Sequence, residues 1–211
     1  MNTIRRSQLD VNSGQISLFN AQDHVKKMRP SVYQYLVVIS PPQEIKQKVE
    51  GLRNGLKTRV YLGTHNLKSI PYITVGTFSV EKPLDKTIGD RFQNLFGDER
   101  QFLITLKPVN YFDHGRQSKT IYMGVEDGNV IEGFYKKLSF ILKETPKTFT
   151  PHLSIASTIP PAVFDTAFPF LKSNAFEESF TCNNLLILER SFYNGIVSNY
   201  SVFKEIKLLA A

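Results

Sequence analysis

A histidine and a serine lie two positions apart in the apolar segment from Thr150 to Ser157. Alternate side chains of an extended strand point to the same face, so His152 and Ser154 are predicted to lie together. Histidine accepts or donates a proton near neutral pH, and a hydroxyl binds phosphoryl oxygens. The pair indicates a proton-transfer site for a phosphate ester. A single histidine in a short strand is also compatible with a structural role.

A related segment runs from Ile70 to Gly76, about eighty residues upstream. It keeps the proline and the hydroxyl of the first segment, but it has Tyr72 at the position of the histidine and Thr74 at that of the serine. The side chains of Tyr72 and Thr74 are expected to share one face in the same way. Two such strands facing each other would form one site with one complete and one altered half.

The elements that must position these motifs follow one order twice. The hydrophobic patterns predict strands at 33–40, 72–80, 102–112, 120–125, 150–157, 185–188 and 199–208. They predict helices at 45–56, 84–96, 130–142 and 163–171, and a polar loop at 59–69. Strands that alternate with helices indicate α/β or α+β packing. The repeated order predicts an internal duplication, about 33–115 and 119–208, whose motif strands line one cleft.

Composition limits the class of protein. The chain has 211 residues, 41% of them hydrophobic, which suffices for one globular body or two closely packed lobes. Its formal charge of +7 favours an anionic partner such as a phosphate ester or RNA, although a basic solvated surface explains it equally well. The lone Cys182 excludes an internal disulfide. Without an apolar leader or a membrane-spanning run, a cytoplasmic protein is expected, with no membrane partner.

The first 30 residues differ from the rest. They carry five Lys or Arg residues against two Asp residues, and only Ile16 to Phe19 offers an apolar stretch. We interpret residues 1–30 as a basic extension outside the folded domain of residues 31–211, either draped over it or acting as an arm that binds RNA or a partner.

Several other chemistries are not supported by the sequence. Gly115 to Thr120 lacks the second glycine that a phosphate-binding loop places before its lysine. No two histidines have the spacing of metal ligands, so neither a metal nor another cofactor is expected. A Gly-x-Ser-x-Gly nucleophile motif is also missing from the sequence.

With its paired motifs and repeated order, the chain resembles the two-histidine (2H) phosphoesterases, which include 2′-5′ RNA ligases and cyclic nucleotide phosphodiesterases. The family signature is two His-x-Thr/Ser motifs. Here Pro151-His152-Leu153-Ser154 matches it, and Pro71-Tyr72-Ile73-Thr74 departs from it at the histidine. The resemblance covers about 33–208 and implies a duplicated two-lobed α+β fold, with two sheets and outer helices around a central cleft.

The resemblance also implies a reaction, the cleavage of a 2′,3′-cyclic phosphate or a 2′-5′ linkage at an RNA end or in a cyclic nucleotide. One histidine would act as general base and the other as general acid, while the hydroxyls of Thr74 and Ser154 hold the phosphoryl oxygens. Recognition of a DNA sequence is not expected. Tyrosine has an ordinary pKa of about 10 and is a poor base at pH 7, so Tyr72 puts full activity in question.

Three interpretations follow from the altered motif. Tyr72 binds the phosphate or acts as a slow acid while His152 is the base; or the cleft binds a phosphate, nucleotide or RNA without turnover; or His65 or His114 replaces the missing histidine. Further candidates are cations that would neutralise phosphate charge, Lys68, Lys107 and Arg190, and tyrosines that would stack on a base, Tyr111 and Tyr193. Solvated or packing roles are the alternatives for all of these residues.

Overall fold

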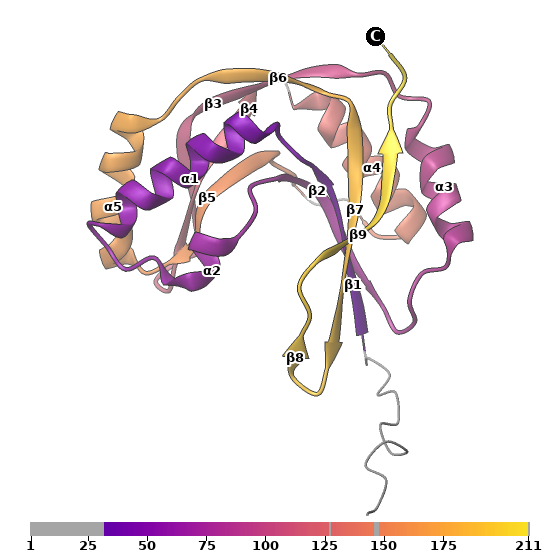
Figure 1. Ribbon diagram of the computed structural model, residues 1–211, viewed down its shortest axis with the longest axis horizontal. Coiled ribbons are helices and arrows are strands. Elements are labelled where there is room, and N and C mark those ends of the chain that lie inside the picture. Colours follow the sequence, from indigo (N-terminus) through magenta and orange to yellow (C-terminus); the bar gives the residue numbers. More distant parts are fainter. Residues whose placement is uncertain (1–31, 127, 146–147, 211) are drawn as a thin grey trace, which may run out of the picture.

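The computed structural model describes residues 32–126, 128–145 and 148–210, which leaves the predicted extension of residues 1–30 outside it. A strongly curved sheet forms an arch, with α1 and α5 on one side of the view and α3 and α4 on the other (Figure 1). The strands are β1 (Val32–Ile39), β2 (Ile73–Val80), β3 (Phe102–Asp113), β4 (Lys119–Glu126), β5 (His152–Ile159), β6 (Glu178–Cys182), β7 (Asn184–Tyr193), β8 (Ile196–Val197) and β9 (Ser201–Lys207). The helices are α1 (Gln43–Lys57), α2 (Gly63–Lys68), α3 (Lys86–Phe96), α4 (Asn129–Leu142) and α5 (Pro161–Asn174).

Local sequence signals set the ends of several elements. Pro41 and Pro42 end β1 and lead into α1, and Pro161 begins α5, where its fixed backbone angle suits the first helical turn. Asp85 caps α3, because its side chain accepts a hydrogen bond from the amide of Ile88 at 3.0 Å. The predicted loop at 59–69 contains the short helix α2, which is too short for a periodic hydrophobic pattern to reveal.

All strand pairs inside the sheet are antiparallel, in the order β6-β3-β4-β5-β2-β1-β7-β8, with β9 also paired to β7. We call β3 to β6 the His152 half and β1, β2, β7, β8 and β9 the Tyr72 half. These halves meet at one residue pair between β5 and β2. The two expected sheets are therefore joined into one. Each half takes strands from both parts of the chain, since β3 joins the His152 half and β7 joins the Tyr72 half.

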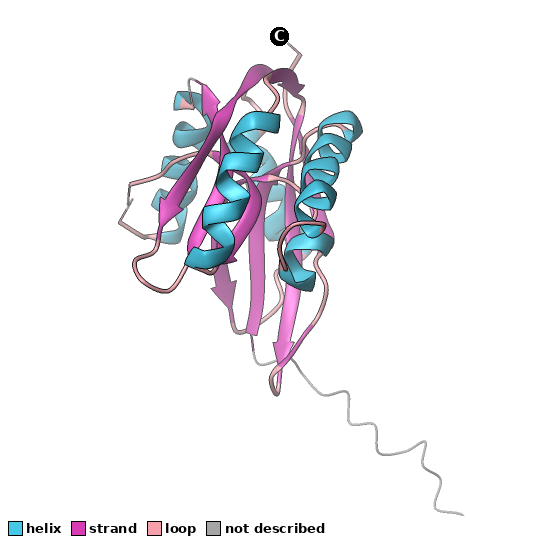
Figure 2. Ribbon diagram, turned by 90° about the vertical axis from the view of Figure 1, so that its left-hand side faces the viewer, coloured by secondary structure: helices cyan, strands magenta, loops and turns pink. Residues whose placement is uncertain are grey.

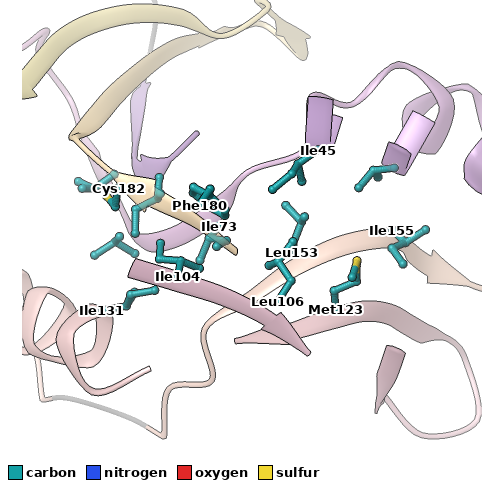
Figure 3. Packing of buried hydrophobic residues seen from close by; sticks show 14 of the residues in the cluster. Ile45, Ile73, Ile104, Leu106, Met123, Ile131, Leu153, Ile155, Phe180 and Cys182 are labelled. Atoms are coloured by element: carbon teal, nitrogen blue, oxygen red, sulfur yellow. The ribbon is translucent and has the colours of Figure 1, made fainter. Parts of the chain in front are cut away.

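Helices cover one face of the sheet, and their buried residues form one core with the inward residues of the strands. Helix α1 packs on β5 and α5, whereas α4 packs on β2. Figure 2 shows helices at the outside of the strands, and Figure 3 shows Ile45 of α1 facing Leu153 of β5 in this core. The opposite face of the two central strands is left free for the motif residues.

Two equivalent β-bulges interrupt the motif strands. In β2 the pairing with β1 passes from Thr74 to Gly76 and skips Val75. In β5 the pairing with β4 passes from Ser154 to Ala156 and skips Ile155. A bulge changes the direction of the residues that follow it. Each strand therefore directs its motif side chains to the open face, and the residue after the bulge, Gly76 or Ala156, lies toward the core. The shared position of the bulges agrees with an internal duplication.

Candidate functional site

The two motif strands meet where Ile73 of β2 is paired with Leu153 of β5. Both of these side chains are fully buried, so the residues on either side of each point to the opposite, open face. Antiparallel register puts the first motif residue of one strand beside the last motif residue of the other. The neighbours are thus Tyr72 beside Ser154 and Thr74 beside His152, all four partly exposed.

His152 is held as a neutral proton acceptor. Its Nδ1 lies 2.7 Å from the carbonyl oxygen of Thr150, and since a carbonyl only accepts, Nδ1 carries the proton. The rings of Phe112 and Tyr122 lie 4.9 Å and 5.1 Å from the imidazole, centroid to centroid. Burial lowers the pKa of His152 below 6.5, and the hydrogen bond to Thr150 partly opposes this shift. At pH 7 the ring therefore offers the lone pair of Nε2.

Tyr72 is held as a phenol. Burial raises its pKa above 10, and the positive charge of Arg190 partly opposes the shift. Arg190 is fixed by its own contacts. Its Nε donates to Oε1 of Gln34 at 2.7 Å, and its guanidinium carbon lies 4.6 Å from the ring centroid of Tyr200. The Tyr200 hydroxyl donates to the same Gln34 oxygen at 2.8 Å. Tyr72 therefore keeps its proton at neutral pH, close to a rigidly held cation.

Arg53 of α1 fixes the backbone behind the site. It is 3% exposed, and its Nε and Nη2 donate to the carbonyls of Ile155 and Ser154 at 2.8 Å and 3.1 Å. Its Nη1 donates to the carbonyl of Ser69, three residues before Tyr72. Although burial lowers its pKa to about 10, Arg53 remains charged at pH 7. One buried side chain thus holds the bulge of β5 against the segment that enters β2.

A cavity of about 800 Å³ opens beside Tyr72, and we call it the Tyr72 pocket. Val38, Leu186 and Leu188 supply apolar surface from β1 and β7. The cations that line it come from α1, α2 and β7: Lys46, Lys68 and Arg190. Among the described residues that line the pocket, none is Asp or Glu. This side of the site is therefore suited to an anionic ligand with an apolar part.

A smaller cavity of about 300 Å³ lies in the His152 half, near Tyr122 and Pro151. Lys107 lines it, but its amine is paired with Glu126, and the carboxylate of Glu132 lines the same cavity. An already paired lysine is less suited to bind phosphate than the cations of the Tyr72 pocket. Of the three predicted phosphate-neutralising cations, Lys68 and Arg190 therefore lie together and Lys107 lies apart.

The two histidines proposed as replacements each have a hydrogen-bond contact of their own. His65 lines the Tyr72 pocket, and its Nε2 is 3.3 Å from the carbonyl oxygen of Ser157. Ser157 is five residues along β5 from His152, a span of about 16 Å in an extended strand. His114 lies in the turn after β3, with its Nε2 3.0 Å from Oγ1 of Thr120. His65 thus lines the same cavity as Tyr72, His114 does not line that cavity, and neither of these contacts is to the His152 ring.

The predicted stacking tyrosines, Tyr111 and Tyr193, do not line the Tyr72 pocket. Tyr111 packs against Phe164 and Phe168 of α5, with ring centroids 4.8 Å and 5.2 Å away, and this arrangement matches the packing alternative. Tyr193 ends β7 and pairs with Ile196 of β8 in a hairpin.

Sequence analysis missed the aromatic pair beside His152 and the bracing of Arg190. Phe112 and Tyr122 stack at 4.2 Å, but they come from different strands with a register shift between those strands. Gln34 and Tyr200 lie more than 160 residues apart in the chain. The alternation of side chains along β4 is the one sequence signal for Tyr122. It places Tyr122 near the motif only when the register that pairs Tyr122 with Ser154 is known.

The curved antiparallel sheet with two motif strands paired at its centre is the architecture of the two-histidine phosphoesterases. The family model of the 2′-5′ RNA ligase superfamily matches residues 41–193, so the chain belongs to that superfamily. No protein with a curated description matches the chain in sequence.

Solved structures agree on the fold. LigT from E. coli in its apo form is similar, with a TM-score of 0.55 and 16% identity over 84% of this chain and 98% of that one. TT0787 from Thermus thermophilus is similar, with a TM-score of 0.55 and 14% identity over 82% of this chain and 97% of that one. At these identities the likeness establishes the fold of the chain and leaves its reaction to be argued from the site.

Proposed function

We propose that the protein is a phosphoesterase that opens 2′,3′-cyclic phosphates or cleaves 2′-5′ linkages at RNA ends or in nucleotides, with His152 as general base. The observation that carries the proposal is the paired site itself: a neutral His152 with its proton on Nδ1 and a protonated Tyr72, each with a hydroxyl residue of the opposite strand beside it. Solved structures of LigT are complexed with phosphate, 3′-AMP and ATP, which supports a phosphate-ester ligand.

The reaction begins from the neutral imidazole of His152 and the protonated phenol of Tyr72. Nε2 of His152 takes a proton from the attacking water as its oxygen forms a bond to phosphorus. The phosphorus bond to the leaving ribose oxygen breaks, and the phenol of Tyr72 gives that oxygen its proton. Thr74 and Ser154 donate hydrogen bonds to the phosphoryl oxygens. Solvent then returns a proton to Tyr72 and removes one from His152.

Tyr72 makes this a slow enzyme. A raised pKa means that the phenol is a weaker acid than an imidazolium, so the leaving oxygen is protonated less readily. A missing acid-base partner typically lowers the rate by about 10²- to 10⁴-fold. The positive charge of Arg190 opposes the rise in the pKa of Tyr72, so the phenol keeps some acidity.

A second candidate function is binding without turnover. The cations and apolar surface of the Tyr72 pocket favour it, because they would hold a phosphate, a nucleotide or RNA whether or not Tyr72 transfers a proton. The site would then be a family cleft whose chemistry has been lost while its ligand is still recognised.

The test is turnover of adenosine 2′,3′-cyclic phosphate and of a cyclic-phosphate-ended RNA oligomer, without added metal. The wild type is compared with His152→Ala, Tyr72→His and the control His114→Ala, after thermal unfolding has shown that each variant is folded. We expect slow turnover that falls by at least about 100-fold in His152→Ala and is retained in His114→Ala.

The variants separate the two functions. Turnover in the wild type that His152→Ala abolishes supports the phosphoesterase. A silent wild type whose activity appears in Tyr72→His supports binding without turnover. Equal turnover in the wild type and His152→Ala would contradict the assignment of His152 as the base.

A further inference from the structure

We infer that the Tyr72 pocket is a subsite for a second nucleotide with its own phosphate, so that the preferred ligand is an oligonucleotide with a terminal phosphate and not a mononucleotide. The inference rests on the proposed function, because it takes the scissile phosphate to lie between the two motifs. It adds which side of the cleft receives the rest of the substrate and which residues select it.

The duplication explains why the cavity on the Tyr72 side, at about 800 Å³, is larger than the cavity of about 300 Å³ on the His152 side. The bulge pairs Ser154 with Tyr122 in the His152 half and pairs Thr74 with Val38 in the Tyr72 half. Tyr122 and Val38 are therefore equivalent positions. At the His152 side, Tyr122 stacks with Phe112 and fills the space beside the motif.

The neighbouring strands continue the comparison. Asn110 is paired with Tyr122, and Leu186 is paired with Val38, so Phe112 corresponds to Leu188 two residues further on. Leucine and valine are smaller than the stacked aromatic rings of the other half. The Tyr72 pocket is the space that this difference leaves.

The pocket has the size and surface that a nucleoside needs. A cavity of about 800 Å³ is far larger than one phosphate and lies within the usual range of small-molecule sites. Leu186 adds apolar lining that suits the face of a base, and the half-buried ring of Tyr200, which lies over the guanidinium of Arg190, also lines the pocket. Stacking of bases on aromatic rings and guanidinium groups tolerates any base, so the subsite selects a nucleoside and not a particular sequence.

Three cations line a pocket that needs only one for the scissile phosphate. Arg190 lines the pocket together with Tyr72 and is held there by Gln34, so we assign it to the reacting phosphate. Lys46 and Lys68 lie on α1 and α2, on other walls of the same pocket. Among the described residues, neither of these lysines is in an ion pair with a carboxylate. Lys46 and Lys68 are available for a second phosphate.

The test measures binding in the His152→Ala background, where no turnover consumes the ligand. By calorimetry we compare a 5′-phosphorylated diadenosine oligonucleotide, the same dinucleotide without the 5′-phosphate, and adenosine 2′,3′-cyclic phosphate. Both 2′-5′ and 3′-5′ linkages are used. We expect the phosphorylated dinucleotide to bind at least tenfold more tightly than either other ligand.

Two sets of variants locate the effect. Lys46→Ala with Lys68→Ala is expected to abolish the advantage of the 5′-phosphate, while the matched control Lys82→Ala with Lys172→Ala, two exposed lysines that do not line the pocket, keeps it. Leu188→Phe, which copies Phe112 into the equivalent position, is expected to weaken both dinucleotides by at least tenfold and to spare the cyclic mononucleotide.

The outcomes separate this inference from the proposed function. An advantage that persists without Lys46 and Lys68, or a wild-type pocket that does not prefer the dinucleotide, overturns the inference. If the preference holds while the wild type turns over neither the cyclic phosphates nor the 2′-5′ dinucleotide, the subsite stands and the phosphoesterase assignment falls.

Discussion

Single residues at the centre of the site are set to opposite proton states by their surroundings. Phe112 and Tyr122 exclude water from His152 and favour its neutral form, and burial of Tyr72 keeps the phenol protonated. Burial disfavours the charged form of either group, so the same effect lowers the pKa of the histidine and raises that of the tyrosine. The two shifts leave a base and an acid that coexist over a wide range of pH.

The pH profile of turnover should therefore be broad. As pH falls, activity is lost when His152 gains a proton, and because its pKa is lowered this limb lies below pH 6.5. As pH rises, activity is lost when Tyr72 loses its proton, and because its pKa is raised this limb lies above pH 10. The measurement is kcat/KM from pH 4 to 11. A maximum confined to pH 6–8 would contradict the assignment of Tyr72 as the acid.

Removing the aromatic edge of Phe112 should shift one limb alone. Phe112→Ala admits water to the imidazole, which stabilises its charged form and raises the pKa of His152 toward 6.5. NMR titration of the ring is expected to show this rise, and the acid limb should move with it. Phe168→Ala, which removes a ring packed on Tyr111, is the control and should leave the titration unchanged.

At the scale of elements, buried contacts hold the motif strands against their helices. Arg53 ties α1 to β5 and to the segment before β2, and Asn66 of α2 makes two hydrogen bonds to the backbone of Ser157, at 3.0 Å and 2.7 Å. Strands β2 and β5 are paired at one residue pair only, so β2 does not bond the backbone groups of β5 that follow it. The side chains of Arg53 and Asn66 bond these groups instead. The frame of the site is therefore built partly from side chains.

Arg53→Ala should destabilise the protein strongly. It removes three hydrogen bonds from a charged donor and leaves buried carbonyls without partners, which predicts a loss of about 3 kcal/mol in the free energy of unfolding. Arg59→Ala is the matched control. Arg59 is exposed in the turn after α1, where it donates to the carbonyl of Gly55 and lies over the ring of Phe170, so a loss below about 1 kcal/mol is expected. Urea titration measures both losses, and equal losses would contradict a role of Arg53 in holding β5 against the segment before β2.

Gly76 keeps β2 close to α4. A Cβ atom there would lie 2.4 Å from Cδ2 of the buried Leu138, so Gly76→Ala should cost about 1–3 kcal/mol of stability through overpacking. Gly133 lies in α4 with no atom within 4 Å of the Cβ position, and Gly133→Ala should stabilise by up to about 1 kcal/mol. Thermal unfolding of the two variants gives the signs, which are expected to be opposite.

Across the whole molecule, the exchange of strands joins the two halves. Strand β7 pairs with β1, and β3 pairs with β4, so neither 33–115 nor 119–208 contains all the strands of one half. The helices are exchanged as well: α4 of the second part of the chain packs on β2, and α1 of the first part packs on β5. In the described residues, no helix is long and apolar enough to span a membrane.

This arrangement predicts one cooperative unfolding transition. Cys182 lies buried in the His152 half, where burial raises the pKa of its thiol to about 12 and suppresses its reactivity. Labelling of this thiol in urea should coincide with the loss of near-ultraviolet circular dichroism from buried tyrosines such as Tyr35 in the other half. Two separate midpoints would indicate that the halves fold independently.

Local patterns in the sequence determine much of this protein. The alternation of residues around His152 and Tyr72 predicts which side chains face together, and the repeated order of elements predicts a duplicated α+β fold. These features are readable because strand and helix periods act over neighbouring residues. The family follows from the two motifs and their order, and the superfamily match confirms it.

Tertiary structure alone decided what surrounds the motifs. The meeting of Ile73 with Leu153, the two bulges and the exchange of β3 and β7 depend on pairing between distant segments, which no local period specifies. Val38 and Leu188, which line the Tyr72 pocket, occupy positions that the stacked rings of Tyr122 and Phe112 fill in the other half. Such differences in side-chain volume take effect only when the strands are brought together and close packing leaves space on one side.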